Sequence, residues 1–145
     1  MGMFDSMHIS ASGLSAERLR MDVIAQNLAN VNSTRGPDGQ PYRRHEVVFQ
    51  TADGQGSGVQ GVSGGSEVPT RGVEVVGIVE DQSALRSVYD PSHPDADQNG
   101  YVYLPNINPV TEMIDMTTAT RAYEANVTAM NAAKNMALKA LDILR

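Results

Sequence analysis

The two ends of the chain carry a regular apolar pattern, and this pattern constrains the fold more than any other feature. In each end, successive members of an apolar stripe are separated by alternating steps of three and four residues. That spacing is typical of the contact stripe between paired α-helices. The main members of the stripe are Met7, Leu14, Met21 and Leu28 near the start, and Met116, Tyr123, Val127, Met130 and Leu141 near the end. The pattern predicts two long helices that pair as an antiparallel coiled coil.

Proline and methionine divide the chain into three segments. All eight methionines lie outside residues 36–108, whereas all seven prolines lie between positions 37 and 109. The last segment has a clear helix start, because Asn108 is a good N-cap, Pro109 suits the first helical position and Glu112 suits the helix dipole. We therefore expect an N-terminal helical segment at 1–35, a central module at 36–108 and a C-terminal helix at 109–145.

The central segment is expected to form strands and loops. Three runs are rich in β-branched or aromatic residues: RRHEVVFQ (43–50), VEVVGIVE (73–80) and YVYL (101–104). A low-complexity Gly/Ser stretch at about 51–72 separates the first two runs and is expected to be a mobile loop. The predicted fold class is therefore α+β, with a small antiparallel β module between two long helices.

Composition excludes several classes of function. A net charge of −6 argues against a nucleic-acid partner, because phosphate binding needs a basic face. The absence of cysteine excludes disulfides and thiolate metal sites. No apolar run is long enough to cross a bilayer, and the N-terminus lacks the pattern of a secretory signal. We expect neither direct membrane insertion nor a cleaved signal peptide.

One short motif raises the possibility of a metal site. DADQNG matches the opening of a calcium loop, with oxygen ligands at Asp95, Asp97 and Asn99. The twelfth position, which should be glutamate, is Asn106, and nearby prolines forbid the helices of an EF-hand. A polar turn is the preferred interpretation, and a soluble calcium-binding module is the alternative. No other pattern indicates a catalytic, cofactor-binding or metal-binding residue, so we expect a protein that is not an enzyme and has no cofactor.

Three asparagines lie where the N-terminal helix is expected to end. Asn32 is predicted to end it in the left-handed conformation that asparagine tolerates. Asn27 and Asn30 share one helical face and flank Leu28, so we expect their amides to form hydrogen bonds across subunit contacts. The apolar stripes alone look too small to offset the entropy of ordering two long helices. Packing against neighbouring copies is expected to order them.

The two ends also resemble a known family. SGLSAERLRMDVIAQNLANVNST (12–34) resembles the N-terminal signature of bacterial flagellar axial proteins, the rod, hook and hook-associated proteins, and RAYEANVTAMNAAKNMALKALDIL (121–144) is similar to their C-terminal helix. Within this family, GPDGQPYRRHEVVFQ (36–50), DPSHPDADQNGYVYLPNINPVTEM (90–113) and the short length resemble the proximal-rod members.

The resemblance implies a structural function in the flagellar basal body. It implies a subunit that polymerises through its terminal helices into a hollow drive shaft, which transmits torque from motor to hook. The implied location is the rod in the periplasmic space, reached through the flagellar type III export apparatus. The implied partners are other copies of the chain, neighbouring rod proteins and that apparatus. Another rod or export-junction subunit is the alternative within the same class.

Overall fold

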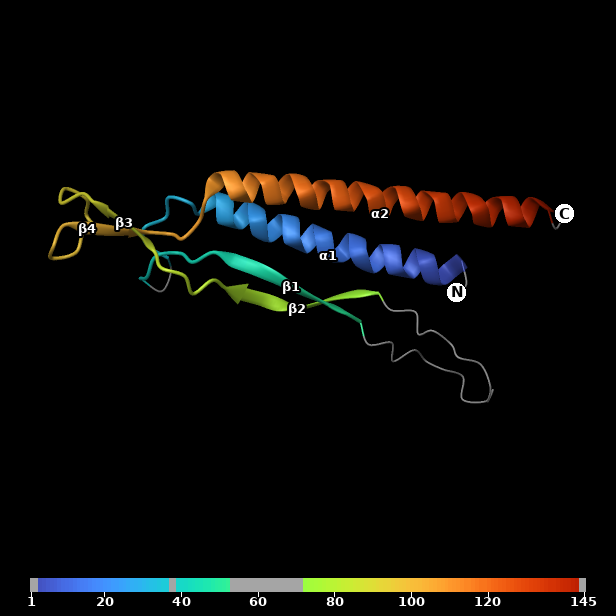
Figure 1. Ribbon diagram of the computed structural model, residues 1–145, viewed down its shortest axis with the longest axis horizontal. Coiled ribbons are helices and arrows are strands. Elements are labelled where there is room, and N and C mark those ends of the chain that lie inside the picture. Colours follow the sequence, from blue (N-terminus) through green and yellow to red (C-terminus); the bar gives the residue numbers. More distant parts are fainter. Residues whose placement is uncertain (1–2, 37–38, 53–71, 144–145) are drawn as a thin grey trace, which may run out of the picture.

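The computed structural model describes residues 3–36, 39–52 and 72–143. Two long helices, α1 (Met3–Ala29) and α2 (Pro109–Ile143), run side by side in opposite directions, so both ends of the chain lie at the same end of the molecule (Figure 1). Two small antiparallel sheets join them: β1 (His45–Thr51) pairs with β2 (Val73–Glu80), and β3 (Arg86–Tyr89) pairs with β4 (Tyr101–Leu104). The predicted α+β class with paired terminal helices is confirmed.

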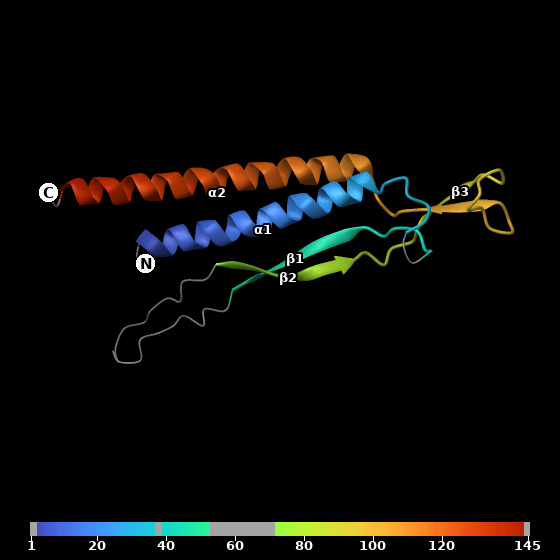
Figure 2. The same cartoon turned by 180° about the vertical axis from the view of Figure 1, so that it is seen from behind.

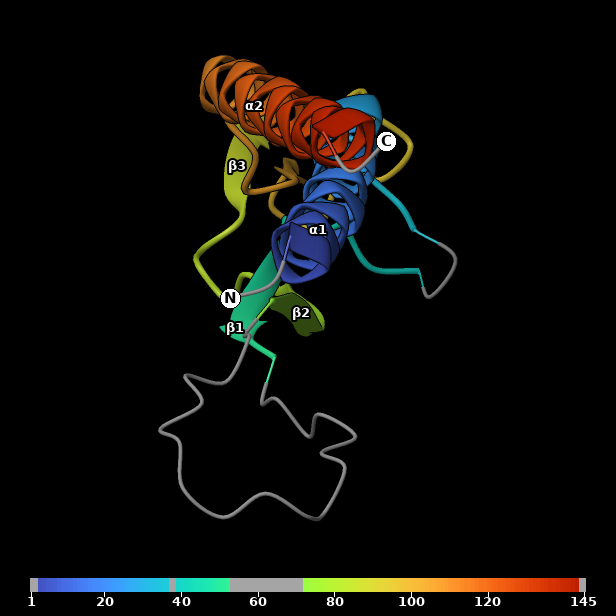
Figure 3. The same cartoon turned by 90° about the vertical axis from the view of Figure 1, so that its right-hand side faces the viewer.

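Helix α1 forms the middle layer of the molecule. Helix α2 covers one side of it, and the β1–β2 hairpin lies along another (Figures 1 and 2). The view along the helices in Figure 3 shows the same order of layers. The hairpin is fixed to the helix where the Ser12 hydroxyl accepts a hydrogen bond of 3.0 Å from the Val73 backbone N–H. Gly72 permits this approach, because a Cβ there would lie 2.6 Å from the Ser12 Oγ.

The small antiparallel β structure predicted between the helices consists of two separate two-stranded sheets. The β3–β4 hairpin lies beyond the end of α1 and the start of α2, away from β1–β2 (Figure 1). Strand β3 was missed because only two of its four residues, RSVY, are β-branched or aromatic, whereas all but one of those in YVYL are. The loop expected to be mobile at 51–72 falls mainly on residues 53–71, which lie outside the described ranges, and Thr51 belongs to β1.

Helix α2 begins where the sequence predicted. The Asn108 side chain accepts a hydrogen bond of 3.0 Å from the Val110 N–H, and the Asn108 carbonyl accepts one from the Glu112 N–H. This is N-cap geometry, and Pro109 occupies the first helical position.

The end of α1 differs from the prediction in its position and its cause. The helix ends at Ala29, and a tight turn follows in which the N–H of Val31 and that of Ser33 each donate to the carbonyl three residues earlier. The Asn30 side chain donates a 2.8 Å hydrogen bond to the carbonyl of Gln26, which also accepts one of 3.1 Å from the Asn30 backbone N–H. Among the described residues, positive φ occurs only at Gly39 and Gly100. The left-handed conformation predicted for Asn32 is therefore wrong, and Asn30 provides the cap.

The contact stripe between the helices is displaced from the predicted one. Gly13 approaches Asn126 so closely that an added Cβ would lie 3.0 Å from the amide nitrogen. On α2 the buried positions are Glu112, Ala119 and Ala133, and the half-buried ones include Met116, Tyr123, Asn126, Val127, Met130 and Ala137. The most buried positions, Glu112, Ala119 and Ala133, therefore lie outside the predicted stripe, because small and polar residues hold the closest positions. Such residues are invisible to a search for apolar periodicity.

Candidate functional site: a buried polar junction and the outer face of α2

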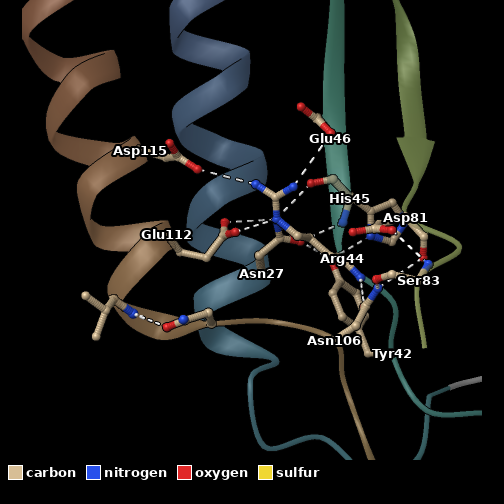
Figure 4. Close-up of polar contacts among 12 residues, drawn as sticks. Asn27, Tyr42, Arg44, His45, Glu46, Asp81, Ser83, Asn106, Glu112 and Asp115 are labelled. Atoms are coloured by element: carbon tan, nitrogen blue, oxygen red, sulfur yellow. Dashed lines mark hydrogen bonds and ion pairs between the residues drawn. The ribbon is translucent and has the colours of Figure 1, made fainter. Parts of the chain in front are cut away.

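Asn27 is the centre of a buried polar cluster at the point where the helices meet the first strand. Its side chain is completely buried. The amide nitrogen donates to the His45 carbonyl at 2.8 Å and to the Glu112 carboxylate at 3.1 Å. The amide oxygen accepts from the His45 backbone N–H at 3.0 Å and from the Tyr42 hydroxyl at 3.1 Å (Figure 4). Two donors and two acceptor positions are all that an asparagine side chain offers, so every one is used.

Arg44 supplies the charge that lets Glu112 be buried. Its Nε lies 2.6 Å from the Glu112 carboxylate, and another guanidinium nitrogen lies 3.3 Å from Asp115, one turn further along α2 (Figure 4). A third contact, 3.6 Å long, reaches the exposed Glu46. The hydrogen bond to Glu112 raises the pKa of Arg44 above its usual value, although burial opposes this. The guanidinium therefore stays charged and bridges the two carboxylates of α2.

Asn106 extends the cluster to the segment that follows β2. Its side-chain oxygen accepts a 2.9 Å hydrogen bond from the Arg44 backbone N–H. Its amide nitrogen donates to the Ser83 hydroxyl at 2.7 Å and to the Asp81 carbonyl at 3.2 Å. The Asp81 carboxylate in turn accepts from the Ser83 N–H, which lowers the pKa of Asp81.

Tyr42 and His45 cover the cluster from the start of β1. The Tyr42 hydroxyl lies 2.8 Å from the His45 Nδ1, and the two rings are 5.0 Å apart. Burial raises the pKa of Tyr42, and the negative charges of Glu112 and Glu80 raise it further. We call the cluster formed by Asn27, Tyr42, Arg44, His45, Asn106, Glu112 and Asp115 the junction.

The junction can position chain segments, and its chemistry suits that task. It joins α1, the start of β1 and the first turns of α2, and Asn106 ties it to the segment after β2. Buried polar groups that satisfy one another specify one arrangement, because any displacement leaves an unpaired group in a low dielectric. The charged groups are engaged with each other, and Arg44, His45 and Asp115 also line a cavity of about 280 Å³ beside the junction.

The calcium-loop motif has a structural use in the fold. The Asp95 carboxylate accepts a 2.8 Å hydrogen bond from the Thr34 hydroxyl and lies 3.8 Å from the Arg35 guanidinium. The Asp97 carboxylate accepts from the N–H groups of Asn99 and Tyr101. In the described part of the chain, no three His, Cys, Asp or Glu side chains are placed to hold a metal ion together. These contacts support the polar turn, which attaches the β3–β4 hairpin to the segment after α1.

The residues predicted to pack against other subunits fall into three environments. Asn27 lies inside the chain, and its bonds are intramolecular, so the structure replaces the intermolecular role expected for it. Leu141 is exposed on α2. The remaining residues are half-buried, and they include Asn30, which bonds to its own helix. They are Met7, Leu14, Met21, Leu28, Asn30, Met116, Tyr123, Val127 and Met130.

The sequence reasoning missed an apolar surface on the outer face of α2. Val110, Met113 and Ile114 are more than half exposed, and they lie together over the first turns of the helix. Val110, Ile114 and the neighbouring threonines lie outside the predicted stripe, which is why periodicity did not single them out. A second apolar group, Met136, Leu138, Leu141 and Ile143, is exposed at the other end of α2. Within the described ranges, neither helix is long and apolar enough to cross a membrane.

Comparisons with known proteins identify the family. Residues 7–37 match the family model described as "Flagella basal body rod protein", and residues 98–143 match "Flagellar basal body rod FlgEFG protein C-terminal". The chain is 44% identical to the flagellar basal-body rod protein FlgC of Borreliella burgdorferi, over 100% of the chain and 99% of that protein. It is 47% identical to FlgC of Bacillus subtilis, over 99% of both chains. For FlgC of Salmonella typhimurium the identity is 41%, over 99% of the chain and 98% of that protein. The chain therefore belongs to the FlgC family of flagellar basal-body rod proteins.

Proposed function

We propose that the chain is a subunit of the proximal rod, and that its helices α1 and α2 pack with those of neighbouring subunits to form a hollow shaft that transmits torque. As a rod protein it is a structural subunit, not an enzyme. Membership of the rod family implies assembly with other rod subunits. The observation that carries the finer proposal is the exposed apolar surface that Val110, Met113 and Ile114 form on α2.

The shape of the fold suits a packed tube. A helix pair with a rigid polar junction at one end can carry load along its axis, because rotation or sliding of one helix against the other breaks buried hydrogen bonds. Half-buried residues of the predicted apolar stripe, such as Met21, Tyr123 and Met130, leave part of their surface available to neighbouring subunits. We propose them, with the other half-buried residues of the predicted stripe and Leu141, as subunit contacts.

The proposed route to the rod is export through the flagellar type III apparatus without a cleaved signal, followed by assembly in the periplasmic space. A cysteine-free chain suits this route, because no disulfide can close before the chain has passed through a narrow channel. The proposed segments are the N-terminal helical segment at 1–35, the central part at 36–108 and the C-terminal helix at 109–145.

Deletion of the gene, followed by complementation, tests the proposal. The deletion strain should be non-motile and should lack a hook, and the intact gene should restore both. Basal bodies isolated from the complemented strain should contain the chain. A motile deletion strain, or isolated basal bodies without the chain, would overturn the proposal. A helix-breaking substitution, Met130→Pro, should fail to complement, because proline in a helix interior costs about 3 kcal/mol or more.

A further inference from the structure

We propose that His45 and Glu80 form a two-ligand site for a divalent transition-metal ion such as zinc, at the end of the β1–β2 hairpin that adjoins the junction. The site goes beyond the proposed function and belongs to the single chain, because both ligands come from one hairpin. His45 is the first residue of β1, and it lies directly opposite Glu80, the last residue of β2, in the register of the two strands.

The hydrogen bonds of Tyr42 place the proton on the His45 ring. The Asn27 amide oxygen is an acceptor, because it receives the His45 backbone N–H, and it also receives the single hydrogen of the Tyr42 hydroxyl at 3.1 Å. The Tyr42 hydroxyl oxygen lies 2.8 Å from the His45 Nδ1 (Figure 4), so this contact is a hydrogen bond only if Nδ1 is the donor. Neutral His45 therefore carries its proton on Nδ1 and a lone pair on Nε2.

The opposite arrangement would leave the cluster with an uncompensated contact. If the Tyr42 hydroxyl donated to the His45 Nδ1, the oxygens of Tyr42 and Asn27 would face each other at 3.1 Å with no hydrogen between them. Asn27 is completely buried, so water could not relieve this contact. The hydrogen bonds of the junction thus select the ring form in which Nε2 can bind a metal.

The distance between Nε2 and Glu80 suits a shared metal ion. The His45 Nε2 lies 3.8 Å from a carboxylate oxygen of Glu80, which is too long for a hydrogen bond. Zinc binds both imidazole nitrogen and carboxylate oxygen at about 2.1 Å, so two such bonds span about 3.4 Å at the tetrahedral angle. The Glu80 side chain is 56% exposed, and a small rotation of it closes the difference.

Tyr42 provides the support that a metal-binding histidine needs. Such a histidine usually donates its second ring N–H to an oxygen, which fixes the ring and makes the other nitrogen more basic. The Tyr42 hydroxyl accepts that bond here, and its own hydrogen bond to Asn27 fixes the hydroxyl in turn. The imidazole is therefore oriented before any ion binds, which reduces the entropy lost on binding.

The donor set and the exposure define the class of ion. One imidazole and one carboxylate favour zinc or a neighbouring transition metal over magnesium and calcium, which prefer oxygen ligands. His45 is 30% exposed, so an ion can enter and water can complete its coordination. In the described part of the chain no third His, Cys, Asp or Glu joins the pair, so the affinity should be well below that of a four-ligand structural site.

The other two histidines provide matched controls. The His93 Nδ1 accepts a 3.1 Å hydrogen bond from the Asp95 N–H, so its neutral ring carries the proton on Nε2 and has no free lone pair. His8 lies on α1, away from the β1–β2 pair, and is exposed. Zinc bound by either of these residues would be independent of His45 and Glu80.

Zinc titration of the purified full chain tests the site. In about 1 mM zinc chloride the folding equilibrium constant, measured by urea unfolding, should rise about threefold, because the folded state binds the ion. His45→Gln and Glu80→Gln should each lose this rise, whereas His8→Gln and His93→Gln should keep it. Magnesium chloride at the same concentration controls for general attraction of divalent ions to a chain with a net charge of −6 and should give no such rise.

Nitrogen NMR of the isotope-labelled full chain tests the ring form directly. Neutral His45 should be protonated on Nδ1 and neutral His93 on Nε2, and zinc should shift the His45 Nε2 signal most. Glu80 lies outside the junction, so Glu80→Gln and the NMR measurement remain available if His45→Gln does not fold.

Several results would overturn the metal site. They are a wild-type chain that zinc does not stabilise, a zinc effect that persists in Glu80→Gln or is lost in His8→Gln, and a His45 ring protonated on Nε2. A zinc effect that magnesium reproduces would show adventitious binding only and would also overturn it. All these measurements use the isolated chain, so their failure leaves the rod assignment intact, and the deletion strain tests that assignment separately.

Discussion

The side-chain amide of Asn27 donates a hydrogen bond of 3.1 Å to the carboxylate of Glu112, and neither residue is accessible to solvent. This contact joins the last turn of α1 to the first turn of α2, and Arg44 supplies the balancing charge. The helix pair is therefore fixed in register by a polar contact at one end. Its apolar contacts along the rest of the interface involve small or half-buried side chains, which specify register less strongly.

Asn27→Asp should destabilise the purified chain strongly. The substitution removes the two N–H donors and places a second carboxylate beside Glu112. Loss of one partner in a buried charged cluster costs about 3 to 5 kcal/mol. Urea unfolding, followed by circular dichroism, measures the change. Asn32→Asp is the matched control, because Asn32 is exposed and should change the free energy of unfolding by less than about 0.5 kcal/mol.

Arg44→Met should cost about 3 kcal/mol or more, because Glu112 would remain buried without its balancing charge. The double variant Arg44→Met/Glu112→Gln should recover part of this loss, since the neutral amide needs no counterion. Arg18→Met on the exposed side of α1 serves as the control and should be close to neutral. A double variant that is no more stable than the sum of the two single changes predicts would show that the pair is not coupled as the structure indicates.

The effect of Gly13→Ala on stability should depend on the residue opposite Gly13. Alanine favours a helix interior over glycine by about 1 kcal/mol, but here the new Cβ would lie 3.0 Å from the Asn126 amide nitrogen. We expect a small net effect in the wild-type chain and a stabilisation of about 1 kcal/mol in the Asn126→Ala background, where the close contact is gone. A thermodynamic double-mutant cycle measures this coupling. Strict additivity would place Gly13 away from Asn126.

Alkaline pH should destabilise the chain partly through Tyr42. Burial, with the charges of Glu112 and Glu80, raises the pKa of Tyr42 above the value of 10.0 that applies to the unfolded chain. A raised pKa means that the folded state holds the proton more tightly. The contribution of Tyr42 to the free energy of unfolding is therefore complete below about pH 10. It falls as the pH rises through the pKa that Tyr42 has in the folded state. Tyr42→Phe, although it loses a hydrogen bond, should show a smaller decrease of the urea midpoint between about pH 9 and 11. If the urea midpoint of Tyr42→Phe decreased as much as that of the wild type, Tyr42 would not be a source of the alkaline destabilisation.

The sequence predicted those parts of the fold that depend on local signals. Asn108 and Pro109 mark the start of α2 because an N-cap and a first-turn proline act within a few residues. The β1 and β2 strands could be recognised from their valines and isoleucine. The end of α1 was predicted less well, because asparagine can cap a helix in more than one way, and its neighbours decided between Asn30 and Asn32.

The junction could not be predicted, because its partners are far apart in the chain. Asn27 and Glu112 are separated by 85 positions. Both residues stood out in the sequence. Asn27 was expected to form hydrogen bonds across subunit contacts, and Glu112 was expected to interact with the helix dipole. Polar residues in an interface have no periodic signal of their own, and Arg44 lies at the start of a run predicted only as a strand (43–50). The one available clue was the unusual density of asparagines at the end of α1.

The most direct test of this account is the amount of the chain in isolated basal bodies, divided by its amount in whole cells, for Asn27→Asp and Asn32→Asp. The ratio corrects for loss of an unstable variant before assembly. If the junction holds the helix pair in the form that the rod uses, the ratio should fall on the order of tenfold for Asn27→Asp, since a register penalty of 1.4 kcal/mol already gives that factor. The ratio for Asn32→Asp should match the wild type. Equal ratios for the two variants would contradict the account.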